Sequence, residues 1–219
     1  IKLVLFKGHT EMVCLVHYLT FRIKIMARKE AIRRQRHGRA VIIGAGLTER
    51  WYFSHLQFHF NLKIKIRPRF FGNENITTLE KRIIQVLSND GIAVVIFDAD
   101  VSTWNDAEKA RLIALKKKYE KSKRVILCDS QPSIEYWFLL HYLKTNRFFG
   151  TSKAVVDELV KYVERFEKTN DFLRNPKWVE DLCNNGKLKD ALERAISYGE
   201  QGPSYSNVWK AIKYVGIKL

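Results

Sequence analysis

The sequence predicts an α/β domain built on a parallel, four-stranded sheet in the order 2-1-3-4, flanked by helices and followed by a helical C-terminal part. Two observations support this fold class. Short apolar runs alternate four times with helix-like segments, which is the pattern of parallel strands joined by crossover helices. The longest run, residues 92–97, has six apolar residues without a break. Such a run indicates a strand that is buried on both faces of the sheet.

The elements of the domain follow in order from apolar patterns and helix-start signals. Strands are expected at residues 40–43, 61–66, 92–97 and 124–128. The second strand alternates lysine with apolar residues, which is typical of an edge strand with one wet face. Thr48 is the expected N-cap of the first helix, Thr77 or Thr78 of the second, and a polar helix should begin near Asp106.

The chain after residue 150 is expected to be helical. Helices are predicted at residues 152–166, 178–183, 187–198 and 206–215 from apolar residues at helical spacing. We therefore divide the chain into an N-terminal extension with a basic arm (1–39), an α/β domain (40–145) and a helical region (146–219).

Two carboxylates stand where the central strand ends. Asp98 and Asp100 follow the apolar run, and in extended backbone residues two apart point to the same side. Chemistry in parallel sheets gathers beyond the carboxyl ends of the strands, and the order 2-1-3-4 puts the first and third strands side by side there. We favour a site for one hard cation over a capping Asp98 beside a solvated Asp100.

The charge of the chain points to an anionic partner. The formal net charge is +16, and residues 1–39 hold ten Lys or Arg against two acids. Nucleic acid is the simplest partner, ahead of an acidic protein or a membrane surface. Candidate phosphate contacts are Arg33, Arg34, Arg36, Lys63, Lys65 and Arg67; for the basic arm, a solvated lead-in without contacts is an equal alternative.

The cysteines and the N-terminus favour a cytoplasmic protein. Cys14, Cys128 and Cys183 are odd in number and far apart, which indicates a reducing compartment. Residues 1–25 are too polar to span a bilayer and lack the pattern of a signal peptide, so we expect an extension without a functional role.

Three stretches together resemble the RloB-like proteins, a Toprim-related group associated with restriction and abortive-infection loci. They are Gly-x-Gly-Leu-Thr-Glu at 44–49, Phe-Asp-Ala-Asp at 97–100, and Ser-Gln-Pro-Ser-Ile-Glu-Tyr-Trp-Phe-Leu-Leu-His-Tyr at 130–142. The resemblance runs from about Val41 into the helical region, and the last stretch is its most specific part. It implies a Toprim-like or Rossmann-like fold.

The resemblance also implies an activity, a metal and site residues. Toprim domains use a glutamate after the first strand and Asp-x-Asp after the third to bind Mg²⁺ for phosphodiester chemistry, and Asp98 and Asp100 match the second element. Glu135 and His141 match positions of the group, although a helix-dipole role and a core histidine are the readings that their surroundings alone favour. The implied setting is a nuclease in anti-phage defence. Its expected partners are DNA or RNA (tRNA included), an ATPase encoded nearby and a second copy of the chain.

The first Toprim element departs from the pattern at Ala45. The expected glutamate stands directly before the glycine, and here Ala45 precedes Gly46. Either the chain is a degenerate member or the glutamate was replaced to silence a toxic nuclease, and the intact Gly46, Thr48 and Glu49 favour replacement. The carboxylate of Glu49 is a partial substitute for the missing glutamate, but we do not expect its side chain to point in the same direction.

Two other classes of function are open from the sequence. A catalytically dead adaptor would bind the ATPase and nucleic acid without cleaving anything. An α/β receiver or nucleotide sensor would also place aspartates at strand ends, but the chain has no phosphate-binding G-x-x-x-x-G-K-[ST] stretch.

Overall fold

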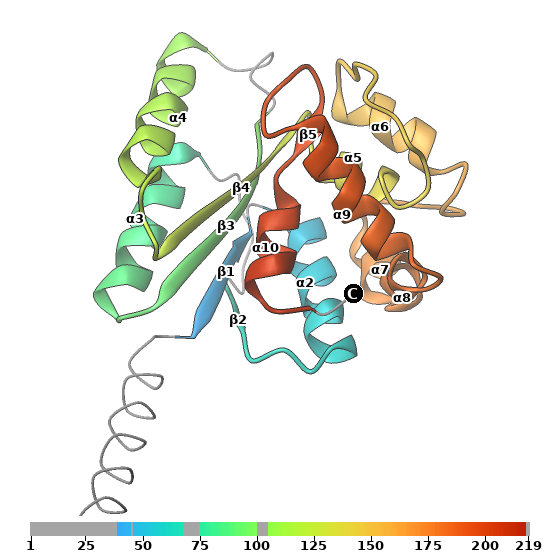
Figure 1. The fold of residues 1–219 in the computed structure, drawn as a ribbon, viewed down its shortest axis with the longest axis horizontal. Helices are drawn as coiled ribbons and strands as arrows, with labels where there is room; N and C mark the ends of the chain where they lie inside the picture. Colours follow the sequence, from blue (N-terminus) through green and yellow to red (C-terminus); the bar gives the residue numbers. More distant parts are fainter. Residues whose placement is uncertain (1–38, 45, 68–74, 100–104, 218–219) are drawn as a thin grey trace, which may run out of the picture. The chain divides into compact units, whose positions relative to one another are not determined.

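The computed structural model describes residues 39–44, 46–67, 75–99 and 105–217, which fold around one five-stranded sheet. The strands are β1 (Ala40–Gly44), β2 (Lys65–Arg67), β3 (Ile92–Asp98), β4 (Val125–Gln131) and β5 (Tyr205–Ser206). Their order is β2-β1-β3-β4-β5, with the first four parallel and β5 antiparallel to β4 (Figure 1). The order 2-1-3-4 is confirmed. The prediction of a purely parallel, four-stranded sheet is wrong, because β5 adds an antiparallel edge.

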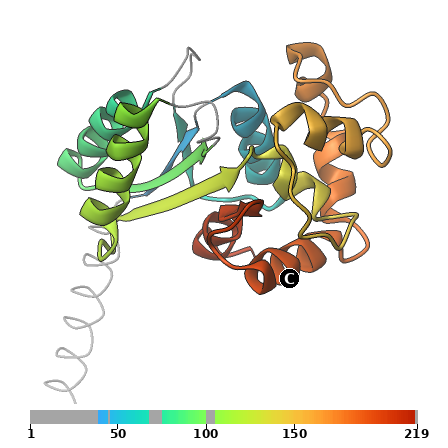
Figure 2. The same cartoon turned by 90° about the horizontal axis from the view of Figure 1, so that it is seen from above.

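Helices lie on both faces of the sheet. In the described part of the chain they are α2 (Leu47–His59), α3 (Ile76–Ser88), α4 (Asp106–Tyr119), α5 (Glu135–Leu139), α6 (Ser152–Leu159), α7 (Asn170–Arg174), α8 (Lys177–Cys183), α9 (Lys187–Tyr198) and α10 (Val208–Tyr214). The helices α3 and α4 cover one face, and α2 with the C-terminal helices covers the other (Figures 1 and 2).

Burial on both faces explains the unbroken apolar run of the central strand. Val94 and Ile96 of β3 belong to the core shared with α2 and the C-terminal helices. Val95 and Phe97 point the other way, into the core under α3 and α4. Successive side chains of a strand alternate between faces, so neither face of β3 can be polar.

An aromatic core joins α2 to the C-terminal helices. Trp137 of α5 donates its indole N–H to the hydroxyl of Tyr52 on α2, over 2.8 Å. The ring of Phe138 lies 5.0 Å from that of Tyr52 and 5.1 Å from that of Trp178 on α8. These rings are buried, and the core they form includes residues of both the predicted α/β domain and the predicted helical region.

Two predicted elements are shorter than expected. Residues 61–64 do not join the sheet, since the Gln57 side chain donates to the carbonyls of Leu62 and Ile64 and so satisfies them locally. The helix predicted at 152–166 ends at Leu159. Arg165 then takes a positive φ of 58°, which reverses the chain and returns the following residues toward α6.

The predicted N-caps were placed too late in the sequence. Gly46, not Thr48, is the N-cap of α2, and Thr48 is buried in the first turn. Asn75, not Thr77 or Thr78, caps α3, and its side chain accepts from the Thr78 backbone N–H over 2.9 Å. At the C-terminus, Tyr205–Ser206 forms β5, so the last helix begins at Val208. None of the helices in these described ranges is both long and apolar enough to cross a bilayer.

Candidate functional site

The candidate site lies at the carboxyl edge of the sheet, where β1 and β3 end. These strands are direct neighbours, with Gly44 at the end of β1 opposite Ile96 of β3. The turn that starts α2 therefore lies near Asp98, the last residue of β3. Three acidic side chains, from α2, β3 and α5, meet here.

Asp98 is fixed by the segment that follows β4. One carboxylate oxygen, Oδ1, accepts a hydrogen bond from the backbone N–H of Ile134 over 2.8 Å. Ile134 directly precedes Glu135, so this bond holds the start of α5 against the end of β3. The residue keeps partial exposure, yet burial of its carboxyl group raises the pKa of Asp98 well above its usual value. The negative charges of Glu49 and Glu135 add to that rise.

Glu49 is buried in the first turn of α2, with an exposed fraction of 4%. Its carboxylate turns back over Gly46: a Cβ added at Gly46 would lie 2.7 Å from Glu49 Oε2. Gly46 is the N-cap and Glu49 is the third helical residue, the position from which a glutamate can bond back to the cap. Burial raises the pKa of Glu49 to about 7, although backbone N–H groups oppose the rise, and the charge of Glu135 raises it further.

Glu135 opens α5 and is 1% exposed. Its Oε2 accepts from the hydroxyl of Ser133 over 2.6 Å and from that of Ser152 over 3.3 Å. Its Oε1 lies 3.0 Å from the ammonium of Lys168, which also donates to Ser152 over 2.8 Å. Ile134 is the N-cap of α5, and the Ser133 hydroxyl bonds to the glutamate side chain.

Three carboxylates thus share one ammonium group. The charge of Lys168 lowers the pKa of both Glu49 and Asp98, but desolvation and mutual repulsion outweigh it. Clustered carboxylates with raised pKa values are common at functional sites, where a cation or a proton relieves the repulsion.

The donor set fits a hard divalent cation, which prefers carboxylate oxygens. Asp98 keeps Oδ2 without a hydrogen bond to the described residues, so this oxygen is available as a ligand. Within the same residues, however, no three carboxylate, imidazole or thiol groups already stand at ligand spacing. Asp98 is the central ligand candidate, with Glu49 and Glu135 beside it.

Several predicted site residues lie outside the described residues. They are Ala45, Asp100, Arg33, Arg34 and Arg36. Of the predicted basic residues, Lys63 and Lys65 are exposed, and Arg67 ends β2 at the same edge of the sheet as Asp98.

His141 lies in the aromatic core. It is 2% exposed, its Nδ1–H donates to the carbonyl of Trp137 over 2.9 Å, and the two rings meet edge to face. Burial lowers the pKa of His141 to about 3, so the ring is neutral near pH 7. None of these contacts involves Glu49, Asp98 or Glu135. The arrangement agrees with the core role that its apolar neighbours in the sequence favour.

Two members of the cluster could not be predicted from the sequence. Lys168 lies in the segment between α6 and α7, and Ser152 is the first residue of α6. Lys168 reaches Glu135 only because the chain turns back after Leu159, and Ser152 reaches it because α6 packs against α5. A local pattern cannot reveal a contact that depends on such a reversal.

Comparison with known proteins agrees with this architecture. Searches of curated proteins and of solved structures gave no match. The family model described as "RloB-like protein" matches residues 40–215, which include all five strands, the three clustered carboxylates and Lys168. The chain therefore belongs to the RloB-like family.

Proposed function

We propose that the chain is a Mg²⁺-dependent nuclease of the Toprim type that acts on phosphodiesters of nucleic acid. The observation that carries the proposal is the meeting of Glu49, Asp98 and Glu135 at the carboxyl edge of the sheet. Three acids around one lysine are a costly arrangement for a fold that needs only stability. A divalent cation offsets that cost, and the net charge of +16 suits a polyanionic substrate.

The residues of the cluster divide the work as follows. Asp98 offers Oδ2, which has no hydrogen bond to the described residues, as a metal ligand, and Glu49 and Glu135 supply the remaining negative charge. Ser133, Ser152 and the backbone N–H of Ile134 hold the carboxylates in place. When bound, Mg²⁺ polarises a phosphate and stabilises the attacking and leaving oxygens. Lys168, whose ammonium lies 3.0 Å from Glu135 Oε1, would add a positive charge to the site.

The alanine at position 45 is compatible with two versions of this function, an inactivated nuclease and an adaptor that does not cleave. By resemblance, a glutamate at this position would serve as a metal ligand or general base, and alanine has no atom for either role. The chain as it stands is then nearly silent. The second candidate, which Ala45 specifically favours, is an adaptor that binds nucleic acid and an ATPase partner without cleavage. In both forms the setting implied by the family is anti-phage defence in the cytoplasm.

A cleavage assay tests the proposal. The native chain, Ala45→Glu, Ala45→Glu with Asp98→Asn, and Ala45→Glu with the surface control Asp157→Asn are incubated with DNA, RNA and tRNA pools, in Mg²⁺ or EDTA. We expect Ala45→Glu to raise cleavage by roughly 10²- to 10⁴-fold, the range for general-base help. Asp98→Asn should abolish that gain because the carboxylates act as one unit. Asp157 is exposed and makes no ion pair with another described residue, so its variant should cleave normally.

Repeating the cleavage assay with the ATPase partner present distinguishes the nuclease from the adaptor. If Ala45→Glu is silent alone but cleaves in Mg²⁺ when the neighbouring ATPase is added, the nuclease proposal stands and the partner is the activator. Silence with the partner present, together with retained binding of nucleic acid, would establish the adaptor instead.

A further inference from the structure

The first half of β4 has no strand partner on its outer edge among the described residues. Ala93 and Ala99 donate their N–H groups to the carbonyls of Arg124 and Ser130, so even-numbered residues of β4 bond to β3. The backbone groups of odd-numbered residues therefore point to the opposite edge. The contact of Asp129 supports this assignment, because its carbonyl accepts from Asn207 N–H on the outer side over 2.8 Å.

The short strand β5 covers only the last part of this edge. It pairs with Ser130 and Gln131, and the chain then turns into α10. Within the described ranges nothing accepts from the N–H of Leu127 or donates to its carbonyl on the outer side, and the N–H of Val125 meets only the hydroxyl of Ser122. From Val125 to Cys128 the edge has no strand partner among the described residues, over about 13 Å.

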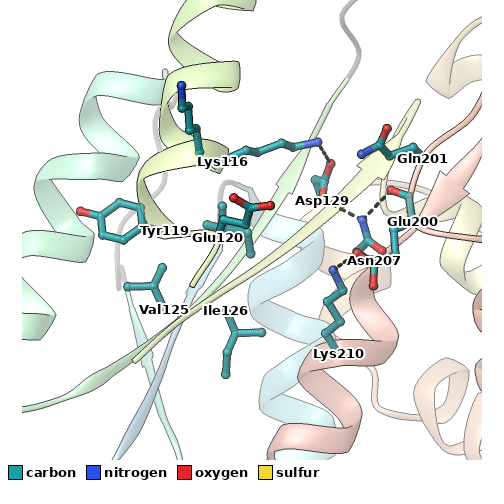
Figure 3. Close-up of a pocket in the computed structure, with 12 residues that line it drawn as sticks. Lys116, Tyr119, Glu120, Val125, Ile126, Asp129, Glu200, Gln201, Asn207 and Lys210 are labelled. Carbon is teal, nitrogen blue, oxygen red and sulfur yellow. Dashed lines mark hydrogen bonds and ion pairs between the residues drawn. The ribbon is translucent and has the colours of Figure 1, made fainter. Parts of the chain in front are cut away.

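A hollow of about 620 Å³ runs along this open edge. Its floor includes Val125, Ile126 and Leu127 of β4, and its walls come from α4, from Glu200 and Gln201, and from α10 (Figure 3). At one end Asp129 is held by Lys116, by the Tyr205 hydroxyl and by Asn207. The space between the walls matches an extended backbone lying beside β4.

Positive charge surrounds the other end of the hollow. Lys116 is neutralised by Asp129, and Lys210 by Glu200. Lys117 at the end of α4, and Lys121 and Lys123 in the turn before β4, are exposed and form no ion pair with other described residues. Lys117 and Glu120 line the hollow, whereas Lys121 and Lys123 stand beside it in the turn before β4. Together these four residues give this end of the edge a net positive charge, which favours an acidic occupant.

We propose that β4 docks an acidic, extended peptide segment of a partner protein, which adds to the sheet as a sixth strand. The segment bonds to the outward backbone groups of Leu127 and Val125. Its acidic side chains, at alternate positions, lie against Lys117, Lys121 and Lys123. This interface is separate from the carboxylate cluster and does not depend on nuclease activity.

Other occupants fit the edge less well. Pairing of two β4 edges from two copies would offer these lysines only Asp129, which Lys116 already neutralises, and residues 1–38 of the chain are themselves basic. Nucleic acid would suit the lysines but would leave the N–H and C=O of Leu127 without strand partners.

The experiment uses a fluorescein-labelled peptide of about nine alternating Glu and Thr residues, long enough to span Val125–Asp129. It is titrated into the full chain and followed by fluorescence anisotropy. The control peptides are alternating Lys and Thr, and the Glu–Thr peptide N-methylated at alternate residues, which removes the N–H groups of one edge. The variants are Lys117→Glu with Lys121→Glu and the matched surface control Lys153→Glu. Hydrogen exchange of the Leu127 amide is measured with and without peptide.

We expect the Glu–Thr peptide to bind and to slow exchange at Leu127. The Lys–Thr peptide and the N-methylated peptide should bind at least about tenfold more weakly, as should the double lysine variant toward the Glu–Thr peptide, whereas Lys153→Glu should bind normally. Equal binding of the N-methylated peptide would overturn strand addition. Slow Leu127 exchange without peptide in a dimeric protein would assign the edge to a second copy. Protection of Leu127 only by an oligonucleotide would assign it to nucleic acid.

Discussion

The three buried carboxylates have different supports, and Glu49 has the least compensation. Glu135 receives two hydroxyls and an ammonium, and Asp98 receives a backbone N–H. Among the described residues Glu49 bonds to backbone N–H groups of its own turn, and burial raises its pKa to about 7. At the scale of single residues, this cluster favours protonation or a bound cation over three bare charges.

The stability of the metal-free protein should fall as the pH rises. Folding raises the pKa of Glu49 from 4.5 to about 7, so its stabilising contribution is complete below about pH 4.5 and is lost as the pH passes about 7. The loss is on the order of 3 kcal/mol. Urea denaturation in EDTA between about pH 5 and about pH 8 measures it. Glu49→Gln should flatten this dependence, and Glu164→Gln, at a side chain that is 88% exposed, should not. Identical slopes for all three proteins would contradict the assignment.

At the scale of elements, periodicity predicted what depends on neighbouring residues in the sequence. β1, β3 and β4 were found because two buried faces demand continuous apolar runs, and the order 2-1-3-4 followed from the requirement that the sites meet. β5 has two residues and is held by the Ser130–Ser206 hydroxyl pair at 2.8 Å and by Asn207, contacts across more than seventy residues. Lys168 likewise joins the site through a chain reversal, so no local pattern contains it.

Tyr52→Phe should lower the stability of the protein by weakening the contact between α2 and α5. The substitution keeps the ring but removes the oxygen that accepts from the Trp137 indole N–H in a fully buried position. An unsatisfied buried donor costs about 1–3 kcal/mol in the free energy of unfolding. Urea denaturation measures the loss, with Tyr162→Phe as control, because that side chain is 40% exposed and has no hydrogen bond with another described residue. Equal stability of the two variants would show that the indole finds another acceptor.

At the scale of the whole molecule, charge is the property most directly encoded in composition. The net charge of +16 predicts binding to nucleic acid that is insensitive to sequence and weakens steeply with salt. Residues 39–219 form one compact unit, so the basic N-terminal residues can be removed without cutting this unit.

Removal of residues 1–38 should weaken nucleic-acid binding and reduce its salt dependence. Each phosphate contact contributes a slope of about −0.9 to the plot of log affinity against log salt on duplex DNA, and the deletion removes nine of the 39 Lys and Arg residues. Anisotropy titrations of both proteins over a salt series measure the two slopes. Equal slopes would place the phosphate contacts within residues 39–219, and affinity independent of salt in both would contradict a nucleic-acid partner.

The most direct test of the central claim, a divalent cation site at the three carboxylates, is calorimetric titration of Mn²⁺ or Mg²⁺ into the native chain and into Asp98→Asn. We expect the native protein to bind the metal weakly, because it has alanine at position 45, and Asp98→Asn to lose the binding heat while remaining folded. Asp157→Asn, which removes an exposed acid on α6, should bind as the native protein does. Metal binding that is the same in Asp98→Asn and in the native chain would contradict the claim.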